Sequence, residues 1–147
     1  IGGKMIKRVL DEEKANYCDK LLEKLIMDEK KYDSSIMNVH IENYFKEVVK
    51  NQDNILLVYE ENNIIKGYIF FKKLDKENGY LIDGLYVEEE YRNLGIAKKL
   101  LTEGLKLIKN RNIDYIGINV LANNKIAFDL YKSFGFKEFK IIMRKEL

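Results

Sequence analysis

The fold is decided by one stretch of sequence, LYVEEEYRNLGIA, which spans residues 85–97. Its first three residues predict the end of a strand, and the turn that follows opens a helix at Gly95. The first N–H groups of a helix have no partner inside the helix, and the helix dipole adds partial positive charge there. Gly95 lets the backbone pass close to a ligand, and Ala97 keeps the next turn small. We therefore predict that the backbone amides from Asn93 to Lys98 hold a phosphate-bearing ligand.

Charged residues on either side of this turn bear on the same prediction. Arg92 and Lys98 are expected to supply positive charge to the phosphate. The three glutamates at residues 88–90 would repel a phosphate, so we expect them to point into solvent, with an acidic rim that attracts a cationic acceptor as the alternative. The turn alone is equally compatible with an ordinary strand-to-helix connection, because its spacing matches neither the dinucleotide nor the triphosphate motif.

A second group of residues follows about thirty positions later. Asn124 is a good helix N-cap, and Tyr131 lies two turns along the same helical stripe. Ala127 between them leaves room for a ligand on that face. A phenol has a suitable pKa for protonating a thiolate leaving group, although a lone tyrosine is more often a packing residue. Gly135-Phe136 predicts a helix C-cap followed by a core residue.

Hydrophobic periodicity outlines the rest of the chain. It predicts helices over residues 11–28, near Tyr44 and Phe45, over 95–109 and over 124–133. It predicts strands over residues 7–10, 55–59, 64–71, 80–87, 115–121 and 139–144. Asn78-Gly79 is a hairpin signal, so the central strands are expected to be antiparallel, and the later strand-helix-strand unit implies a parallel crossover. The predicted fold is a mixed α/β (α+β) single domain, with a mostly antiparallel sheet covered by helices on both faces.

Composition limits the classes of function. The chain has 147 residues, 46% of them apolar and 34% charged, as in a soluble globular domain. A net charge of +2 argues against a nucleic-acid binder, and the lysines on one helix face are more simply a solvated surface. Cys18 cannot form an internal disulfide, and no apolar run approaches a membrane span, so we expect a cytoplasmic protein. We interpret residues 5–147 as the domain and residues 1–4 as an expression-tag remnant.

The loop RNLGIA at residues 92–97 and the segment NKIAFDLY at residues 124–131, followed by Gly135-Phe136, carry a family resemblance. In these motifs, and in the predicted order of its elements, the chain resembles the GCN5-related N-acetyltransferases, the GNAT superfamily. The resemblance implies acetyl-CoA as the donor, an amine as the acceptor and no metal. It also implies the residues that contact the cofactor: Leu85, Tyr86, Val87, Arg92, Asn93, Leu94, Gly95, Ile96, Ala97, Lys98, Asn124, Ala127 and Tyr131.

The resemblance implies Tyr131 as the catalytic acid that protonates the departing thiolate, and it leaves the identity of the base open. Many family members carry a glutamate where this chain has Asn119, which cannot accept a proton but can position a water molecule. Asp83 is the alternative base, since aspartate is disfavoured inside strands and its presence there invites an explanation. The competing interpretation is an exposed or backbone-bonded Asp83.

These features predict an N-acetyltransferase that transfers an acetyl group directly to a primary amine. The alternative is a non-catalytic acyl-CoA-binding module, which would need neither Tyr131 nor a base. Few residues follow Phe136, so the acceptor groove is expected to be open or closed by residues 29–40. His40 near that region has no companion metal ligands. The sequence leaves open the identity of the amine and the choice between monomer and homodimer.

Overall fold

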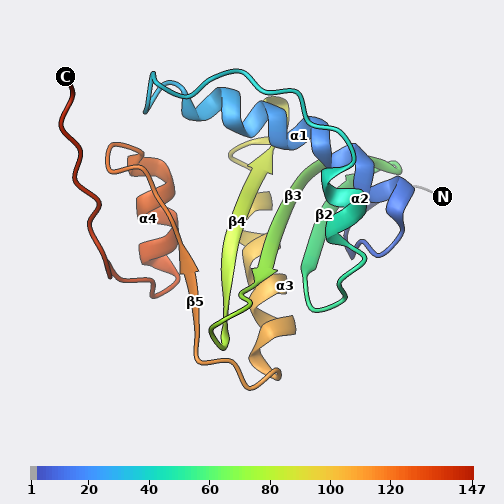
Figure 1. Ribbon diagram of the computed structural model, residues 1–147. Coiled ribbons are helices and arrows are strands. Elements are labelled where there is room, and N and C mark those ends of the chain that lie inside the picture. Colours follow the sequence, from blue (N-terminus) through green and yellow to red (C-terminus); the bar gives the residue numbers. More distant parts are fainter. Residues whose placement is uncertain (1–2) are drawn as a thin grey trace.

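The structure is a computed structural model that describes residues 3–147, and its elements are labelled in Figure 1. The strands are β1 (Lys4–Arg8), β2 (Ile55–Glu61), β3 (Ile64–Lys73), β4 (Gly79–Val87) and β5 (Tyr115–Ile118). The helices are α1 (Glu12–Glu29), α2 (Tyr44–Val48), α3 (Ile96–Lys109) and α4 (Lys125–Ser133), with a short 3-10 helix, η1 (Glu89–Tyr91).

The five strands form one mixed sheet in the order β1-β2-β3-β4-β5. β1 to β4 pair antiparallel, and β5 pairs parallel to β4. β2 and β3 are joined by a two-residue turn, Asn62 and Asn63, with φ of 54° and 65°. Asparagine tolerates this left-handed conformation, which a tight hairpin requires at both positions. The parallel β4–β5 pair needs a crossover connection, and α3 provides it.

Helices cover both faces of the sheet, as the sequence predicts (Figure 1). On one face, α1 and α2 pack on a core that includes Tyr68, Phe70 and Tyr86. On the other face, α3 and α4 pack on a second core that includes Ile69, Phe71 and Ile82. Gly104 allows α3 to lie close to the sheet, because the ring of Phe71 occupies the space that a Cβ atom would need. A fully buried aliphatic side chain in either core contributes about 1.5–3 kcal/mol.

Most predicted elements are confirmed, and three strand predictions need correction. β1 begins at Lys4 and not at residue 7, because its pairing with β2 starts at Lys4 and Glu61. β5 ends at Ile118 and not at residue 121, because the chain then diverges from β4. The predicted strand over residues 139–144 is wrong: that segment pairs with no strand among the described residues, and all its residues are exposed. Alternating apolar residues form a strand only where a sheet edge is in reach.

The interpretation of residues 1–4 as a tag remnant falls partly outside the described residues, since Ile1 and Gly2 are not among them. Lys4 belongs to β1. Over residues 3–147, no helix has the length and apolar character needed to cross a membrane.

Candidate active site

The candidate site begins where β4 and β5 separate. Backbone pairing between them runs from Gly79 and Tyr115 to Ile82 and Ile118. β4 continues to Val87, whereas the chain after Ile118 leaves the strand. Residues 83–87 of β4 therefore present a strand edge that β5 does not pair with. An extended ligand can add to such an edge as a further strand.

A β-bulge marks the start of this opening. β3 pairs Phe70 with Gly84 and Phe71 with Ile82, so Asp83 has no partner in the ladder. Bulges interrupt the regular alternation of side chains and often lie beside active sites. Asp83 is exposed, whereas Ile82 and Gly84 on either side are buried. The aspartate that is unusual for a strand thus lies at an irregular position of the strand.

The turn that leads into α3 presents a row of free backbone amides. Asn93 and Gly95 have positive φ of 63° and 80°. Left-handed residues in a turn direct neighbouring N–H groups to the same side, which creates an anion-binding concavity. Within residues 3–147, none of the N–H groups from Asn93 to Lys98 donates a hydrogen bond, and the first bond of α3 joins the Lys99 N–H to the Gly95 carbonyl at 3.0 Å. These amides have the number and arrangement that a phosphate group needs.

Arg92 does not present a free charge to this turn. Its Nε donates to the Val87 carbonyl at 2.8 Å, and its Nη2 donates to Oδ2 of Asp28 in α1, also at 2.8 Å. Its guanidinium carbon lies 5.2 Å from the centre of the Tyr86 ring. Arg92 therefore ties the turn to α1 and to the end of β4. Lys98 and Lys99 in the first turn of α3 are both exposed, and neither forms an ion pair with a described residue; Lys98 is the one that belongs to the predicted phosphate-binding turn.

The acidic residues before the turn divide into two groups. Glu88 pairs with Lys24 of α1 at 2.9 Å and accepts a hydrogen bond from the Tyr86 hydroxyl at 3.3 Å. Glu89 and Glu90 are exposed. The carboxylate nearest to β4 is therefore neutralised by α1, and the prediction that these residues face solvent holds only for the other two.

α4 carries the second sequence motif, and Asn124 is its N-cap, as the sequence predicts. Oδ1 of Asn124 accepts from the Ala127 N–H at 3.2 Å and caps the helix. Tyr131 is 6% exposed, and its ring packs edge-on against Phe136 with centroids 5.5 Å apart. Burial raises the pKa of Tyr131 above its usual value, and its hydroxyl donates to no described residue. It is therefore a protonated phenol without an internal acceptor. Gly135, with φ of 90°, ends the helix.

Both motifs lie on the same face of the sheet. Tyr131 packs in the same core as Ile96 at the start of α3. A hollow of about 400 Å³ lies at the beginning of α4 and is lined by Ala122, Asn123, Lys125 and Phe128. α3 and α4 therefore contribute to one core on this face of the sheet.

The opposite face of the bulge is polar and tightly built. The Tyr44 hydroxyl lies 3.4 Å from Oδ2 of Asp83. Burial, and then the charge of Asp83, raise the pKa of Tyr44 to about 12, so it remains a neutral donor near pH 7. The Tyr68 hydroxyl is buried without a hydrogen-bond partner among the described residues. It lies against Gly84, where a Cβ atom would be 2.6 Å from its oxygen.

A second carboxylate belongs to this group. Glu29, the last residue of α1, is half-buried, and burial raises its pKa. The pKa of Tyr68 is raised well above its usual value, first by burial and then by nearby groups that include Asp83 and Glu29. Tyr44, Tyr68 and Asp83, from α2, β3 and β4, thus lie beside the bulge, and Glu29 at the end of α1 adds negative charge that contributes to the raised pKa of Tyr68. A raised carboxyl pKa near such a cluster is a common feature of functional sites.

Asp19 fixes the position of Tyr44. Asn43 precedes α2 with a positive φ of 59° and makes no capping hydrogen bond. The buried Asp19 of α1 instead accepts from the N–H groups of Tyr44 at 3.2 Å and Phe45 at 3.0 Å. A carboxylate in this position provides the cap that the helix would otherwise lack. The orientation of Tyr44 therefore depends on a contact between α1 and α2.

The loop between α1 and α2 lies beside the turn that precedes α4. Nδ2 of Asn123 donates to the Tyr32 carbonyl at 3.0 Å. His40, in this loop, is an exposed residue whose ring nitrogens lie 3.3 Å from Glu23 and 2.8 Å from Glu42. Asn119 is exposed just past the end of β5. No group of three His, Cys, Asp or Glu side chains in the described part of the chain is arranged to hold a metal ion.

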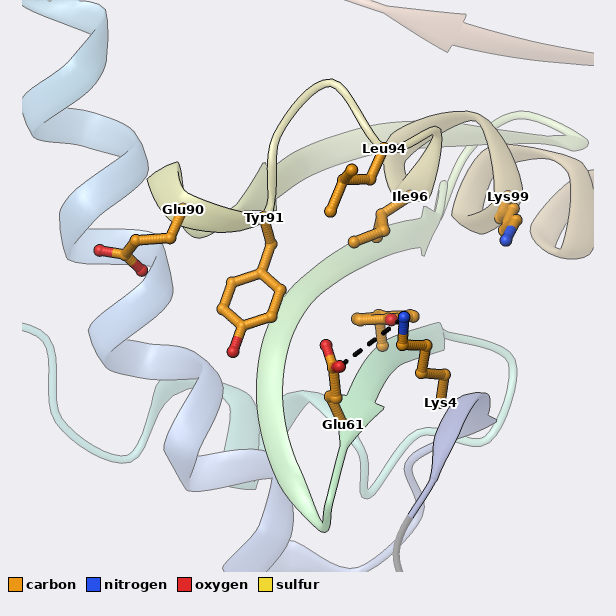
Figure 2. Close-up of a pocket in the computed structure, with 8 residues that line it drawn as sticks. Lys4, Glu61, Glu90, Tyr91, Leu94, Ile96 and Lys99 are labelled. Carbon is orange, nitrogen blue, oxygen red and sulfur yellow. Dashed lines mark ion pairs between the residues drawn. The ribbon is translucent and has the colours of Figure 1, made fainter.

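Another hollow, of about 310 Å³, lies on the other side of the α3 turn (Figure 2). Leu94 and Ile96 line it together with Tyr59, Lys4 and Glu61, and the ion pair between Lys4 and Glu61 measures 3.9 Å. β1 and β2 lie at the far edge of the sheet from β5. This hollow is therefore separate from the opening between β4 and β5.

The sequence predicts the backbone part of this candidate site and does not predict part of its side-chain cluster. These residues come from three different elements: Tyr44 lies on the apolar side of a predicted helix, Tyr68 lies inside a predicted strand, and Glu29 lies just past the helix predicted over residues 11–28. The only local signal was the aspartate at position 83 within a strand. The roles predicted for the cofactor-contacting residues, for Asp83 and for Tyr131 stay predictions.

Comparisons with known proteins identify the family. The model of the acetyltransferase (GNAT) family matches residues 5–136. An N-alpha-acetyltransferase of Sulfurisphaera tokodaii is 32% identical over 111 residues, which cover 67% of this chain and 66% of that protein. A thialysine N-epsilon-acetyltransferase of Bos taurus is 30% identical over 71 residues, covering 48% of this chain and 42% of that protein. The matched stretches thus span two thirds or less of these relatives.

Solved structures share the fold. A mutant protein from Bacillus halodurans superposes with a TM-score of 0.83 at 19% identity, covering 97% of this chain and 99% of that chain. An aminoglycoside acetyltransferase from an uncultured soil metagenomic sample has a TM-score of 0.72 at 17% identity, covering 98% of this chain and 96% of that chain. The match of the family model over most of the sequence, together with this agreement in fold, shows that the chain belongs to the acetyltransferase (GNAT) family.

Proposed function

We propose that this chain transfers the acetyl group of acetyl-CoA directly to a primary amine. The proposal rests on three features that occur together in the structure. The end of β4 has an edge that β5 does not pair with, the N–H groups of residues 93–98 donate no hydrogen bond, and the buried Tyr131 hydroxyl has no acceptor among the described residues. GNAT acetyltransferases use acetyl-CoA as a co-substrate, and the named N-acetyltransferase relatives support an acetyl-CoA-dependent acyltransferase.

The fit to coenzyme A follows from the chemistry of these groups. In this proposal the amides of residues 93–98 and the Lys98 ammonium bind the diphosphate. The pantetheine arm lies along Leu85–Val87 as an added strand. The Asn124 side-chain oxygen is occupied in capping α4, which leaves its amide N–H groups to contact the arm. Acetyl-CoA supplies an acetyl group activated as a thioester.

The transfer step needs three contributions from the chain. A backbone N–H on the β4 edge donates to the thioester carbonyl oxygen and stabilises the charge that develops there. Attack of the neutral amine forms the amide bond and breaks the carbon–sulfur bond. Tyr131 then gives its proton to the thiolate. Asp83, oriented by Tyr44, takes the proton of the amine directly or through a water molecule. Glu29 is a second candidate base, since burial raises its pKa.

The acceptor side suits a cationic amine. The carboxylates of Asp83 and Glu29 attract positive charge to the bulge. Names of related proteins suggest which amines to test: an N-terminal α-amine, a lysine-like side chain and an aminoglycoside.

The experiment measures thiol release from acetyl-CoA with this panel of amines, together with calorimetry of coenzyme A binding. Turnover is expected with at least one amine. Tyr131→Phe should lower kcat roughly a hundredfold and leave coenzyme A affinity unchanged, because the hydroxyl acts as an acid and not as a binding group. Tyr17→Phe, an exposed tyrosine of α1, is the matched control.

Two results would contradict the proposal in different ways. Binding of coenzyme A without turnover on any amine would favour a non-catalytic acyl-CoA-binding module. No heat of association with coenzyme A would remove the phosphate site itself.

A further inference from the structure

The hollow of Figure 2 lies on the far side of the α3 turn from the opening between β4 and β5. Its volume of about 310 Å³ is at the lower end of the range, roughly 300–1,000 Å³, that small-molecule sites occupy. Side chains from β1, β2, η1, the turn and α3 line it. The proposed acetyl transfer uses backbone amides of the turn and none of these side chains.

One wall of the hollow is apolar. Leu94 is 63% exposed, and in Figure 2 its side chain and that of Ile96 point from the turn into the hollow. The ring of Tyr91 forms the adjoining side. This ring is held in place, because it packs against the core and lies 5.1 Å from the Lys66 ammonium. The hollow therefore gives an apolar group a preformed surface to cover.

The opposite wall carries a carboxylate that a neighbouring phenol holds. Glu61, at the end of β2, lies across the hollow from Leu94 in Figure 2, and its side chain is 24% exposed. Burial, and then the charge of Glu61 and its hydrogen bond, raise the pKa of Tyr59, so this hydroxyl stays protonated and donates to the carboxylate. The 3.9 Å pair of Glu61 with the exposed Lys4 contributes little. Glu61 thus keeps negative charge for a cationic ligand group.

A free cation stands on the α3 side of the hollow. Lys99 is exposed and forms no ion pair within residues 3–147. In Figure 2, Leu94 and Ile96 lie between Tyr91 and Lys99, whereas Glu90 points away from the centre of the hollow. The hollow thus combines a carboxylate, an unpaired ammonium group and an apolar wall.

We propose that this hollow binds a free amino acid with an apolar side chain. The ammonium group of the ligand pairs with Glu61 beside the tyrosine rings, which also attract a cation. The carboxylate of the ligand pairs with Lys99, and its side chain covers Leu94 and Ile96. The lining holds two lysines and two glutamates, so a zwitterion matches it better than an ion of one sign.

Binding in the hollow is coupled to binding of coenzyme A, a step that rests on the proposed function. Leu94 and Ile96 alternate with Asn93 and Gly95, the two left-handed residues of the turn. The residues that meet the amino acid therefore also carry amides proposed to hold the diphosphate. A ligand that packs on their side chains favours the turn conformation that presents these amides. The two ligands then raise each other's affinity by the same factor.

The first test titrates the protein with L-leucine and L-phenylalanine by calorimetry in the absence of coenzyme A. Saturable binding of at least one of them is expected. Phenethylamine lacks the carboxylate, phenylpropionate lacks the ammonium group and glycine lacks the apolar side chain. Each of these should bind about tenfold more weakly or worse, the loss of one charge-assisted contact or of the apolar one. No saturable binding, or equal binding of these analogues, would overturn the proposal.

The second test locates the bound amino acid. Glu61→Gln and Lys99→Gln should each weaken its binding about tenfold or more. Glu103→Gln and Lys106→Gln are the matched controls, because these residues form an exposed pair with each other further along α3. Thermal melting verifies that every variant is folded. If Asp83→Asn weakens binding and the hollow variants do not, the amino acid occupies the acceptor site and the proposal is wrong.

The third test measures the coupling. Saturation with the amino acid should raise coenzyme A affinity roughly fivefold in the wild type, within the usual range of coupling energies. Glu61→Gln should bind coenzyme A like the wild type and show no such increase. An unchanged affinity in the saturated wild type would refute the coupling. If coenzyme A does not bind at all, the proposed function fails and the coupling with it, whereas binding in the hollow is decided by the first two tests.

Discussion

The two sides of β4 present different chemical groups: backbone groups on one side and side chains on the other. On the side of α3, the candidate cofactor site consists of backbone groups: the β4 edge at residues 83–87 and the amides of residues 93–98. On the side of α1 and α2, the bulge is lined by the side chains of Asp83, Tyr44 and Tyr68, and Glu29 at the end of α1 contributes charge near Tyr68. Backbone groups are the same in every sequence that adopts the turn. Side chains can differ from one chain to the next without a change of fold.

This difference suggests where the identity of the acceptor is encoded. A backbone site binds the same phosphate-bearing donor whatever the neighbouring side chains are, provided that glycine permits the turn. The side-chain cluster sets charge, size and proton transfer for the second substrate. The most informative substitutions are therefore those that affect one side and leave the other unchanged.

The largest effect is expected from Asp83→Asn, which removes the proposed base and keeps the shape of the side chain. We expect kcat/KM to fall by about a hundredfold to a thousandfold, with coenzyme A affinity unchanged by calorimetry, since general-base contributions are of this size. Asp75→Asn, an exposed residue in the β3–β4 connection, is the control.

Glu29→Gln separates the two candidate bases. If the loss of activity follows Glu29→Gln and not Asp83→Asn, the base is Glu29 and Asp83 has a structural role at the bulge. Equal weakening of coenzyme A binding by either substitution would remove the distinction between the two sides of β4.

Sequence predicts the fold wherever a signal is local. The antiparallel pair signalled by Asn78-Gly79, the cap at Asn124 and the start of α3 at Gly95 all follow from residues a few positions apart. Alternation of apolar residues also predicts a strand over residues 139–144, yet that strand is not formed. Alternation with a period of two shows only that a segment can form a strand. Whether a neighbouring strand is within reach depends on how the elements pack.

The next largest effect is expected from a substitution at the turn before α3, in the backbone part of the candidate site. Gly95→Val should weaken coenzyme A binding roughly tenfold to a hundredfold, the equivalent of one charge-assisted hydrogen bond, because a branched side chain resists φ of 80° and projects toward the ligand. Gly135→Val is a matched control: its φ is 90°, and, as at Gly95, a Cβ atom added there would meet no heavy atom within 4 Å. Calorimetry and thermal melting of both variants separate the local strain from lost binding. If the Gly95→Val and Gly135→Val variants bind coenzyme A with equal affinity, the phosphate site lies elsewhere.

The candidate site could be predicted only in its backbone half. The turn before α3 is recognisable because glycine and the helix start lie within a few residues of each other. Tyr44 reaches Asp83 only because α2 packs on α1 and Asp19 holds its first turn. The sequence predicts Arg92 at the phosphate but gives no sign of its pairing with Asp28, 64 residues earlier in the chain. Contacts between distant elements depend on the packed fold, which the sequence pattern does not specify.

The smallest effect tests that packed arrangement directly. Tyr44→Phe removes a hydroxyl 3.4 Å from Asp83 and keeps the ring, which packs edge-on against Phe45 at 5.0 Å. A hydrogen bond of this length is weak, so kcat should fall roughly twofold to fivefold, with coenzyme A affinity and melting temperature unchanged. Tyr115→Phe is the control, since the hydrogen bond to Glu77 that raises the pKa of Tyr115 lies where β4 and β5 are still paired. In the background of Asp83→Asn, Tyr44→Phe should have no further effect, because a residue that acts by orienting Asp83 has nothing left to orient. Additive losses in the double variant would instead show that Tyr44 contacts the acceptor itself.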